Sequence, residues 1–499
     1  MTDPSSDPQI SLALPAEATA EPGPGEPITG AEYPPALPDA REAFASPKSR
    51  WTHGTLSYTG WGLAGLFFLL LCGDFAYAVR ERSVGPVVQL MLRRLHASDT
   101  TMAFYFSTVP TALTLVISPI VSFKSDRYRS RWGRRIPFLL IPTPIAAVSI
   151  FGIGYVNELG IFVQHLLGMP PSRAGECALG CFAVLWTAFE VATVTAVAVF
   201  NGLVNDVVPR QMLGRFFGLF RQVSLGAGII FNYWVLGQAE VHYRAVFIGI
   251  SVVFFVGFTV MCLGVREGEY PPPPAVAGDG QNVLWNATRQ YFQECFGLAY
   301  YRWMFVGMTL AYVTFTPVNL FSLLYAKQIN VSMGTYGHLL AYSYFISFFL
   351  ASPLGWLVDR AHTLRVTMAT LLIYGVLMLG LGFFIHNTWT FGAALVLHTV
   401  LSGCYWTVSA PLGQALFPRM SFAQYASASG IVTSLFTIIF GLGMGVALDA
   451  TGHAYRLTFF LGGVLALGGL ATLMVVHRKF MRLGGPSDYV APQPGQIAI

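Results

Sequence analysis

The chain has very little charge. Only 11% of its 499 residues are Asp, Glu, Lys or Arg, whereas 54% are hydrophobic, and an average soluble domain has about 25% charged residues. A soluble core could not hide that much apolar surface. The apolar residues also fall into blocks of about 20, the length that crosses a hydrocarbon core as a helix; examples are 60–79, 138–156, 245–265 and 459–476. The composition therefore excludes a soluble domain and predicts a multi-pass membrane protein.

The sequence has few cysteines and no recognisable catalytic motif. The six cysteines have no zinc or redox spacing, so we interpret them as small apolar fillers and expect no metal and no cofactor. The sequence contains no nucleotide-binding loop, zinc motif or nucleophile–base pair, which argues against an enzyme. The formal net charge is +5, but Arg and Lys in a membrane protein mainly set topology. We therefore expect no nucleic-acid partner.

Twelve apolar segments predict an all-α membrane protein with about 12 transmembrane helices in two six-helix bundles. The predicted spans are 57–80, 101–123, 136–157, 179–205, 217–238, 245–265, 301–325, 337–358, 365–386, 391–416, 422–447 and 456–476. We expect a disordered cytoplasmic tail at 1–50, because it is rich in Pro, Ala, Glu and Ser without an apolar core. The bundles occupy 51–266 and 301–477. Between them, 267–300 is a cytoplasmic linker with an amphipathic helix, and 478–499 is a second tail.

An even number of spans places both termini on one side. The loop between spans 2 and 3 contains six basic residues (Lys124, Arg127, Arg129, Arg131, Arg134 and Arg135), and this identifies the side as cytoplasmic. We therefore predict an inner (plasma) membrane protein with both termini cytoplasmic. Four arginines between spans 1 and 2 conflict with this topology, namely Arg80, Arg82, Arg93 and Arg94. We interpret them as part of a lengthened or bent first helix.

The two halves repeat. Span 2 ends with Ser118-Pro119 and runs on to Asp126-Arg127, and span 8 ends with Ser352-Pro353 and runs on to Asp359-Arg360. The exits of spans 4 and 10 also match, since a Pro-Arg pair follows a leucine at the same offset in both (203–210 and 412–419). Two landmarks in register indicate a parallel duplication, as in transporters that alternate access by rocking their halves.

The strongest local motif is SDRYRSRWGRRIPF at 125–138. It resembles the loop between helices 2 and 3 of the sucrose transporters and the glycoside–pentoside–hexuronide cation symporters, which are members of the major facilitator superfamily. Two further segments resemble this family, CGDFA at 72–76 and the stretch from NDVVP at 205–209 to FR at 220–221. The resemblance implies that Asp74 presents a carboxylate to sugar hydroxyls and that Arg221 lies on the substrate side.

The arginine-rich motif also suggests a gate. An acid among arginines can pair across the loop and release when the halves rock. We predict a cytoplasmic gate formed by Asp126, Arg127, Arg131, Arg134, Arg135, Asp359 and Arg360.

Three charged residues fall within predicted spans, where charge is costly and marks function. Asp74, Glu190 and Arg221 could form a polar pocket for substrate, although a buried Glu190–Arg221 or Asp74–Arg221 ion pair that only joins helices is the alternative. Other polar side chains could line the cavity, or could be interhelical contacts and interface aromatics. These are Asn201, Gln222, Asn232, Tyr405 and Trp406. His398 could relay protons or simply pack through hydrogen bonds.

The sequence departs from sodium-coupled relatives at two helix-2 aspartates, where it has Thr114 and Ser118. Two hydroxyls are poor sodium ligands, so sodium coupling is disfavoured. Asp74 and Glu190 suit proton coupling, because a buried carboxylate can be protonated on one side and released on the other.

We therefore predict a monomeric secondary transporter in the lipid bilayer that imports a sugar or glycoside, of the sucrose-like disaccharide class, with protons. There are two alternatives. One is an exporter of the major facilitator type for drugs or other metabolites, which would have a more apolar cavity. The other is a non-transporting membrane sensor.

Overall fold

The computed structural model describes residues 51–270, 281–418 and 421–492. The predictions for the tail at 1–50, for residues 271–280 of the linker and for the last seven residues lie outside this part of the chain. The described chain is almost entirely helical. It begins with a short antiparallel pair of strands, β1 (Trp51–His53) and β2 (Leu56–Tyr58), which the sequence did not lead us to expect.

The amino-terminal half extends from α1 to α9. Thr59 caps the first helix, because its side chain accepts a hydrogen bond from the Gly62 amide. The elements of this half are α1 (Gly60–Arg94), α2 (Asp99–Ala103), the π-helix η2 (Phe104–Thr108), α3 (Val109–Arg127), α4 (Ile136–Leu140), α5 (Pro142–Ile153), α6 (Val156–Leu166), η3 (Pro171–Arg173), α7 (Ala174–Val207), η4 (Arg210–Met212), α8 (Leu213–Ile230), the π-helix η5 (Phe231–Val235), η6 (Leu236–Gln238) and α9 (Tyr243–Gly264).

A linker helix, α10 (Gln281–Phe296), precedes the carboxyl-terminal half. It coincides with the predicted amphipathic stretch. The elements that follow are α11 (Ala299–Val313), α12 (Thr316–Gln328), α13 (Met333–Ala361), α14 (Thr363–Phe384), α15 (Thr388–Ser409), α16 (Leu412–Leu416), α17 (Phe422–Ala450), α18 (Leu457–Arg482) and α19 (Gly485–Asp488).

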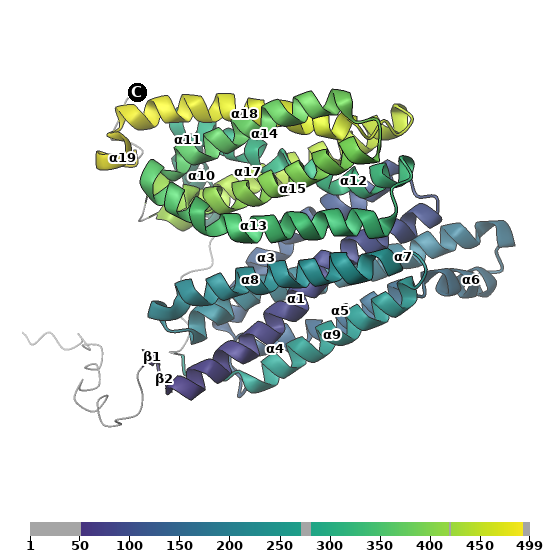
Figure 1. Cartoon of the computed structure of the whole chain (residues 1–499). Coiled ribbons are helices and arrows are strands. Elements are labelled where there is room, and N and C mark those ends of the chain that lie inside the picture. Colours follow the sequence, from purple (N-terminus) through teal and green to yellow (C-terminus); the bar gives the residue numbers. More distant parts are fainter. Residues whose placement is uncertain (1–50, 271–280, 419–420, 493–499) are drawn as a thin grey trace, which may run out of the picture. The chain divides into compact units, whose positions relative to one another are not determined.

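Eleven helical segments of the described chain are long and apolar enough to cross a membrane. The remaining predicted span, 217–238, is also helical, because α8, η5 and η6 continue into one another from Leu213 to Gln238, but this helical stretch carries Arg215, Arg221 and Gln222. Both described ends of the chain lie at the same end of the helical bundle (Figure 1). A chain that starts and finishes on one side must cross an even number of times, so this segment is the twelfth crossing. The predicted all-α fold is therefore confirmed.

The first helix differs most from its predicted range. It starts three residues later than predicted and continues 14 residues past position 80, to Arg94. Arg80, Arg82, Arg93 and Arg94 are thus all helical, as expected for a lengthened first helix. Pro86 lies inside this helix, which continues past it.

Other differences are local. A helix that we did not predict, α6, follows the third span and packs against α7, where Gly160 meets the backbone of Ala178. Spans 7 and 10 are each interrupted near a proline, at Pro317 and at Pro411, because proline removes a helical hydrogen bond and clashes with the preceding turn.

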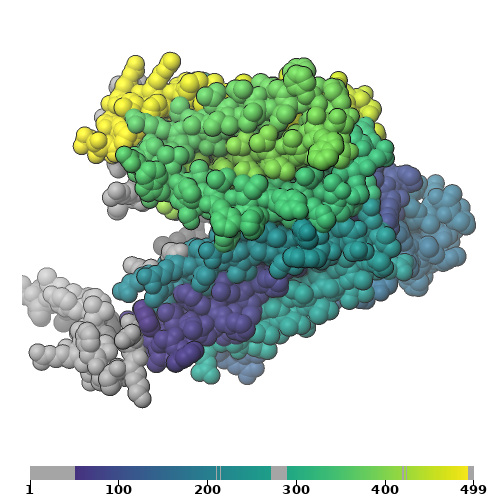
Figure 2. All heavy atoms as spheres, in the orientation of Figure 1, coloured from purple at the N-terminus to yellow at the C-terminus, as the bar shows by residue number. Residues whose placement is uncertain are grey.

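The two halves meet at one end of the bundle. There α17 packs against α2 and η2, while α13 packs against η5 and η6. A Cβ on Gly445 would lie 2.7 Å from the Thr100 Cα atom, so only glycine allows α17 to approach α2 this closely. Figure 2 shows the amino-terminal half (purple to teal) and the carboxyl-terminal half (green to yellow) in contact on the right of the view, with a hollow between them on the left.

Candidate functional site

A polar cavity lies between the two halves, at about the middle of their length. Its volume is about 470 Å³, within the range of about 300–1,000 Å³ typical of small-molecule sites. The amino-terminal half contributes residues of α1 and α8, and the carboxyl-terminal half contributes residues of α12, α13 and α15. The lining consists of Glu81, Arg82, Pro86, Arg221, Leu225, Asn319, Tyr344, Ser347, Thr399, Ser402, Gly403 and Trp406.

The extension of α1 supplies the charged wall of the cavity. Arg82 reaches both halves, because its guanidinium donates to the Ser224 hydroxyl of α8 (3.3 Å) and to the Tyr344 hydroxyl of α13 (3.5 Å). Pro86 has no N–H, so the Arg82 carbonyl has no helical donor four residues ahead. In the described part of the chain, neither Arg221 nor Glu81 forms a hydrogen bond or a salt bridge. Both groups are therefore available to a ligand.

The opposite wall is aromatic and hydroxylic. Trp406 is held by Tyr312 and Tyr405, whose rings lie 5.1 and 5.4 Å from its own. It is 40% exposed, so part of its ring is free to contact a ligand. Ser347, Thr399 and Ser402 lie in the same wall. An aromatic face beside hydroxyls and charged groups suits a ligand that has apolar faces and polar edges.

The structure places two of the predicted substrate residues, Arg221 and Trp406, in the cavity lining. Asp74 and Glu190 are not part of the lining, and both are 7% exposed. The charged neighbour of Asp74 is Glu81, and that of Glu190 is Arg80. The three charged side chains therefore do not share one pocket. The reason is that α1 continues beyond the predicted span, so residues two turns after Asp74 reach the cavity instead.

The other predicted lining residues divide into two kinds. Asn201 and Gln222 are exposed, whereas Asn232 and Tyr405 are buried. Asn232 donates to the Gly228 carbonyl in its own helix (2.7 Å), and Tyr405 packs against Trp406. Tyr405 therefore acts on the cavity through its neighbour.

Sequence reasoning missed Glu81 and Arg82 as residues of the cavity lining. The available signal was the run Arg80-Glu81-Arg82 directly after an apolar span. Once the helix is extended through this run, its charges fall inside the bundle.

A second polar cluster, which we call the latch, joins the halves at one end of the bundle. The Asp449 carboxylate at the end of α17 accepts hydrogen bonds from the Asp99 and Thr100 amides (2.9 Å each) and from the Thr100 hydroxyl (2.6 Å). Asp99 in turn accepts from Tyr455 (2.8 Å) and contacts the His453 imidazole (2.7 Å). The five latch residues hold the N-terminus of α2 against the carboxyl-terminal half.

The latch has the composition of a metal site but does not need an ion. Potential ligand atoms of Asp99, Asp449 and His453 lie within 4.8 Å of one another. However, each carboxylate already accepts hydrogen bonds from the amides, hydroxyls and imidazole of the latch, and these contacts satisfy it. An ion pair between Lys327 and Glu240 also joins the halves at this end.

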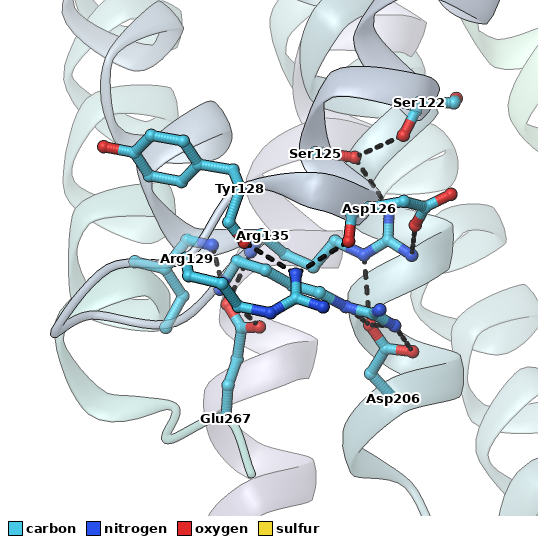
Figure 3. A network of polar contacts seen from close by, with 10 residues as sticks. Ser122, Ser125, Asp126, Tyr128, Arg129, Arg135, Asp206 and Glu267 are labelled. Carbon is cyan, nitrogen blue, oxygen red and sulfur yellow. Dashed lines mark hydrogen bonds and ion pairs between the residues drawn. The ribbon is translucent and has the colours of Figure 1, made fainter. Parts of the chain in front are cut away.

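The opposite end of the bundle contains the arginine-rich loop. Figure 3 shows its polar contacts, which we call the loop network. Arg135 pairs with Asp126 (2.6 Å) and Asp206 (3.0 Å) and donates to the Ser125 hydroxyl (2.8 Å). Arg134 pairs with Asp206 (2.8 Å). Burial alone would lower the pKa of Arg134, but Asp206 keeps that pKa above its usual value.

Glu267 completes the loop network from the start of the linker. Its carboxylate accepts hydrogen bonds from three successive backbone amides, those of Arg134, Arg135 and Ile136 (2.8–3.0 Å), and therefore caps the N-terminus of α4. Gly133 precedes these amides with φ +106°, and a Cβ there would lie 2.5 Å from the Glu267 carboxyl group. The close approach and the positive φ both require glycine.

The loop network lies within the amino-terminal half and ties together the ends of α3, α4, α7 and α9. Of the predicted gate residues, it brings together Asp126, Arg134 and Arg135. The others lie outside it. Arg127, Arg131 and Arg360 lie over the rings of Phe123, Trp132 and Trp356, respectively, and Asp359 is exposed.

The prediction missed Asp206 and Glu267 as members of the network. Both are acids at the ends of apolar spans, and a loop with six basic residues requires such partners.

The chain has recognisable relatives. Residues 95–479 match the family described as MFS/sugar transport protein. This match covers most of the chain, from the residue after α1 into α18.

Solved structures with the same fold also exist. A bacterial homolog of the human lysosomal transporter Spinster, in an inward-facing and occupied conformation, is 12% identical with a TM-score of 0.57, and the match covers 87% of this chain and 98% of that one. A bacterial homologue of the iron transporter ferroportin, in an inward-facing state, is 16% identical with a TM-score of 0.58 (82% and 98% covered). The nucleoside transporter NupG is 13% identical with a TM-score of 0.58 (83% and 98% covered). At these identities the likeness concerns the fold alone.

Proposed function

Because this chain belongs to the MFS/sugar transport protein family, we propose that it is a secondary active transporter that takes up a sugar or glycoside together with protons. The observation that carries the proposal is the cavity between the halves, with Glu81 and two arginines on one wall and Trp406 on the other. Sugars have apolar ring faces that stack on aromatic rings and hydroxyls that bond to charged groups. A disaccharide-class ligand is also compatible with a volume of about 470 Å³.

The distribution of contacts between the halves supports alternating access. The hydrogen bonds and ion pairs between described residues of the two halves lie between the level of Arg82 and the latch. The loop network, by contrast, stays within one half. Such a carrier is closed at the latch and open toward the arginine-rich loop, and rocking of the halves would exchange the two ends.

Asp74 and Glu190 remain our candidates for proton coupling. Asp74 Oδ2 is buried without a hydrogen-bond partner. A buried charged oxygen without a partner is costly, so this atom is suited to hold a proton during part of the cycle. Asp74 also lies two turns before Glu81 on α1, which would allow its charge to influence the cavity.

The position of the arginine-rich loop supports an orientation in the membrane. Basic loops stay on the cytoplasmic side, so we propose that the loop network is cytoplasmic, that the latch faces outward, and that both termini are cytoplasmic. We further propose that the protein acts as a monomer in the inner membrane, because the cavity is completed by the two halves of one chain.

Uptake into proteoliposomes tests this function. We would measure entry of [14C]sucrose, [14C]maltose and methyl β-D-[14C]glucoside under an imposed proton gradient, with and without a protonophore. Wild type is expected to accumulate at least one of these sugars only when the gradient is present. Arg221→Gln should lose about tenfold or more of this uptake, because a hydrogen bond from a charged group is worth about 1.5–3 kcal/mol.

The matched control is Arg215→Gln. Arg215 lies on the same helix and is exposed but outside the cavity lining, so its loss should leave uptake near the wild-type level. Uptake that persists after collapse of the proton gradient would contradict proton coupling. Absence of uptake of every sugar by the folded wild type would contradict sugar transport and favour an exporter or a sensor.

A further inference from the structure

Three polar side chains form a hydrogen-bonded chain behind the aromatic wall of the cavity. Tyr374 on α14 bonds to Nδ1 of His398 on α15 (2.8 Å), and Nε2 of His398 bonds to Oδ1 of Asn319 on α12 (3.0 Å). Tyr374 and His398 are buried, with exposed fractions of 0% and 1%, whereas Asn319 is exposed in the cavity lining. The chain thus runs from the sealed interior of the carboxyl-terminal half to the substrate cavity.

The donors and acceptors fix the direction of this chain. An amide oxygen only accepts, so Nε2 must carry a proton and donate to Asn319. A neutral imidazole has a single N–H, so Nδ1 must accept from the Tyr374 hydroxyl. If Nδ1 carried the proton instead, it would donate to the Tyr374 oxygen, and the buried Tyr374 O–H would have no acceptor among the described residues. An unsatisfied buried donor is costly, so the tyrosine selects one tautomer of His398.

The selected tautomer determines what Asn319 offers to a ligand. Oδ1 of Asn319 accepts the hydrogen bond from His398. Both hydrogens of the amide are on Nδ2, which His398 does not use. This nitrogen makes no hydrogen bond with another described residue, and the side chain lies at the cavity. The carboxyl-terminal wall therefore presents fixed N–H donors beside the ring of Trp406.

We propose that Asn319 binds a substrate oxygen by donating from Nδ2, and that Tyr374 and His398 are positioning residues that hold this amide in its donor orientation. This inference rests on the proposed sugar transport. The ligand it specifies carries an oxygen acceptor, such as a hydroxyl, ring or glycosidic oxygen, next to a face that contacts Trp406. His398 acts here as a neutral hydrogen-bond bridge, because a protonated ring could not accept from Tyr374.

Nitrogen NMR tests the chain without any substrate. In proteoliposomes containing protein labelled with [15N]histidine, the His398 signals are identified as those that disappear in His398→Gln. We expect Nε2 to be protonated and Nδ1 to be unprotonated in wild type. Tyr374→Phe removes the donor to Nδ1. The Asn319 amide is then free to rotate and donate from Nδ2 to an unprotonated Nε2, so His398 should become a mixture of tautomers. A protonated Nδ1 in wild type, or an unchanged spectrum in Tyr374→Phe, would overturn the inference whatever the uptake assays give.

Uptake kinetics then test the role in binding. With the labelled sugar that wild type accumulates, among sucrose, maltose and methyl β-glucoside, Asn319→Asp should raise KM about fivefold with kcat nearly unchanged, as expected for the loss of one hydrogen bond of about 1 kcal/mol. Tyr374→Phe should raise KM by a smaller factor. Tyr325→Phe is the matched control, since the one partner of its buried hydroxyl among the described residues is the Ile385 carbonyl, and it should leave KM unchanged.

A series of deoxy sugars identifies the contact. One deoxy position should raise KM about fivefold in wild type and have no effect in Asn319→Asp, because both changes remove the same hydrogen bond. If every deoxy sugar raises KM by the same factor in wild type and in Asn319→Asp, Asn319 does not contact the substrate and the inference is wrong. If wild type takes up none of the sugars, the proposed function fails, and the NMR result alone then decides whether the hydrogen-bonded chain exists.

Discussion

The latch provides the sharpest test of how the two halves move. Asp449→Ala removes the carboxylate that accepts three hydrogen bonds from Asp99 and Thr100 at the start of α2. The rest of the latch, His453 and Tyr455 on Asp99, stays in place. The variant should therefore favour the conformation in which the latch end is open, while the protein remains folded.

The size of the shift follows from these contacts. A hydrogen bond to a charged group is worth about 1.5–3 kcal/mol, but the three bonds share one partly buried carboxylate, and replacing a helix cap by Ala costs about 0.5–2 kcal/mol. We therefore expect the three hydrogen bonds to Asp449 together to stabilise the closed latch by about 2 kcal/mol relative to the open one. Because 1.4 kcal/mol is a factor of ten in an equilibrium constant, the ratio of open to closed latch should rise about 30-fold.

Distances between two spin labels would measure this ratio. Val241 and Trp389 are exposed, at 73% and 88%, and lie on different halves, Val241 next to the Glu240–Lys327 ion pair and Trp389 at the start of α15. Labels on cysteines at these positions, with the six native cysteines replaced, should show a longer distance that gains population in Asp449→Ala. Asp488→Ala, which changes an exposed acid far from the latch, is the control and should leave the distances unchanged. A change below about twofold in the populations of Asp449→Ala would refute the reasoning.

Three further predictions concern the loop network, the linker and the cavity. Gly133→Ala should lower the midpoint of thermal unfolding by several degrees, because its Cβ would collide with the Glu267 carboxyl group at a φ of +106°. Glu267→Gln should also lower the midpoint. Scanning fluorimetry in detergent measures both variants, and an unchanged midpoint in Gly133→Ala would contradict the capping role of Glu267. Hydrogen bonds from Gln424 and Gln290 lower the pKa of Glu294 below its usual value, so Glu294 stabilises the docking of α10 at neutral pH and this contribution is lost as the pH falls through that lowered pKa. Hydrogen exchange at 289–296 should rise in wild type as the pH falls through the lowered pKa of Glu294 and be high already at pH 7 in Gln424→Ala, and equal exchange in the two proteins at pH 7 would argue against this contact. Trp406→Ala should raise the KM for sugar about tenfold while Trp389→Ala does not, as measured by uptake, since only the former ring lines the cavity.

The helices were largely predictable because membrane segments obey local rules. A block of about 20 apolar residues must satisfy its backbone within the lipid, and a helix is the way for a single segment to do so. The matched Pro119 and Pro353 both lie inside long helices that end at corresponding acid–arginine pairs, as the internal repeat indicated. The end of α1 was less predictable. Pro86 usually ends or kinks a helix, but here its missing N–H affects only the Arg82 carbonyl, and the helix continues to Arg94.

The set of residues that line the cavity could not be predicted, because it depends on contacts between distant parts of the chain. Arg221 and Trp406 could be identified as candidates from their residue types, but the sequence does not say that Glu81, and not Asp74, meets them in one cavity. That choice depends on the rotation and length of α1, which packing against α8 and α9 decides.

The sequence by itself determined the class of protein, the number of crossings, the repeat of the two halves and the basic side of the bundle, since each follows from the composition and order of neighbouring residues. Only the tertiary structure decided which charges meet. The latch pairs residues about 350 positions apart, Asp99 and Asp449, and the hydrogen-bonded chain of Asn319 joins three separate helices. Such contacts arise from the packing of whole helices, which no local pattern of residues specifies.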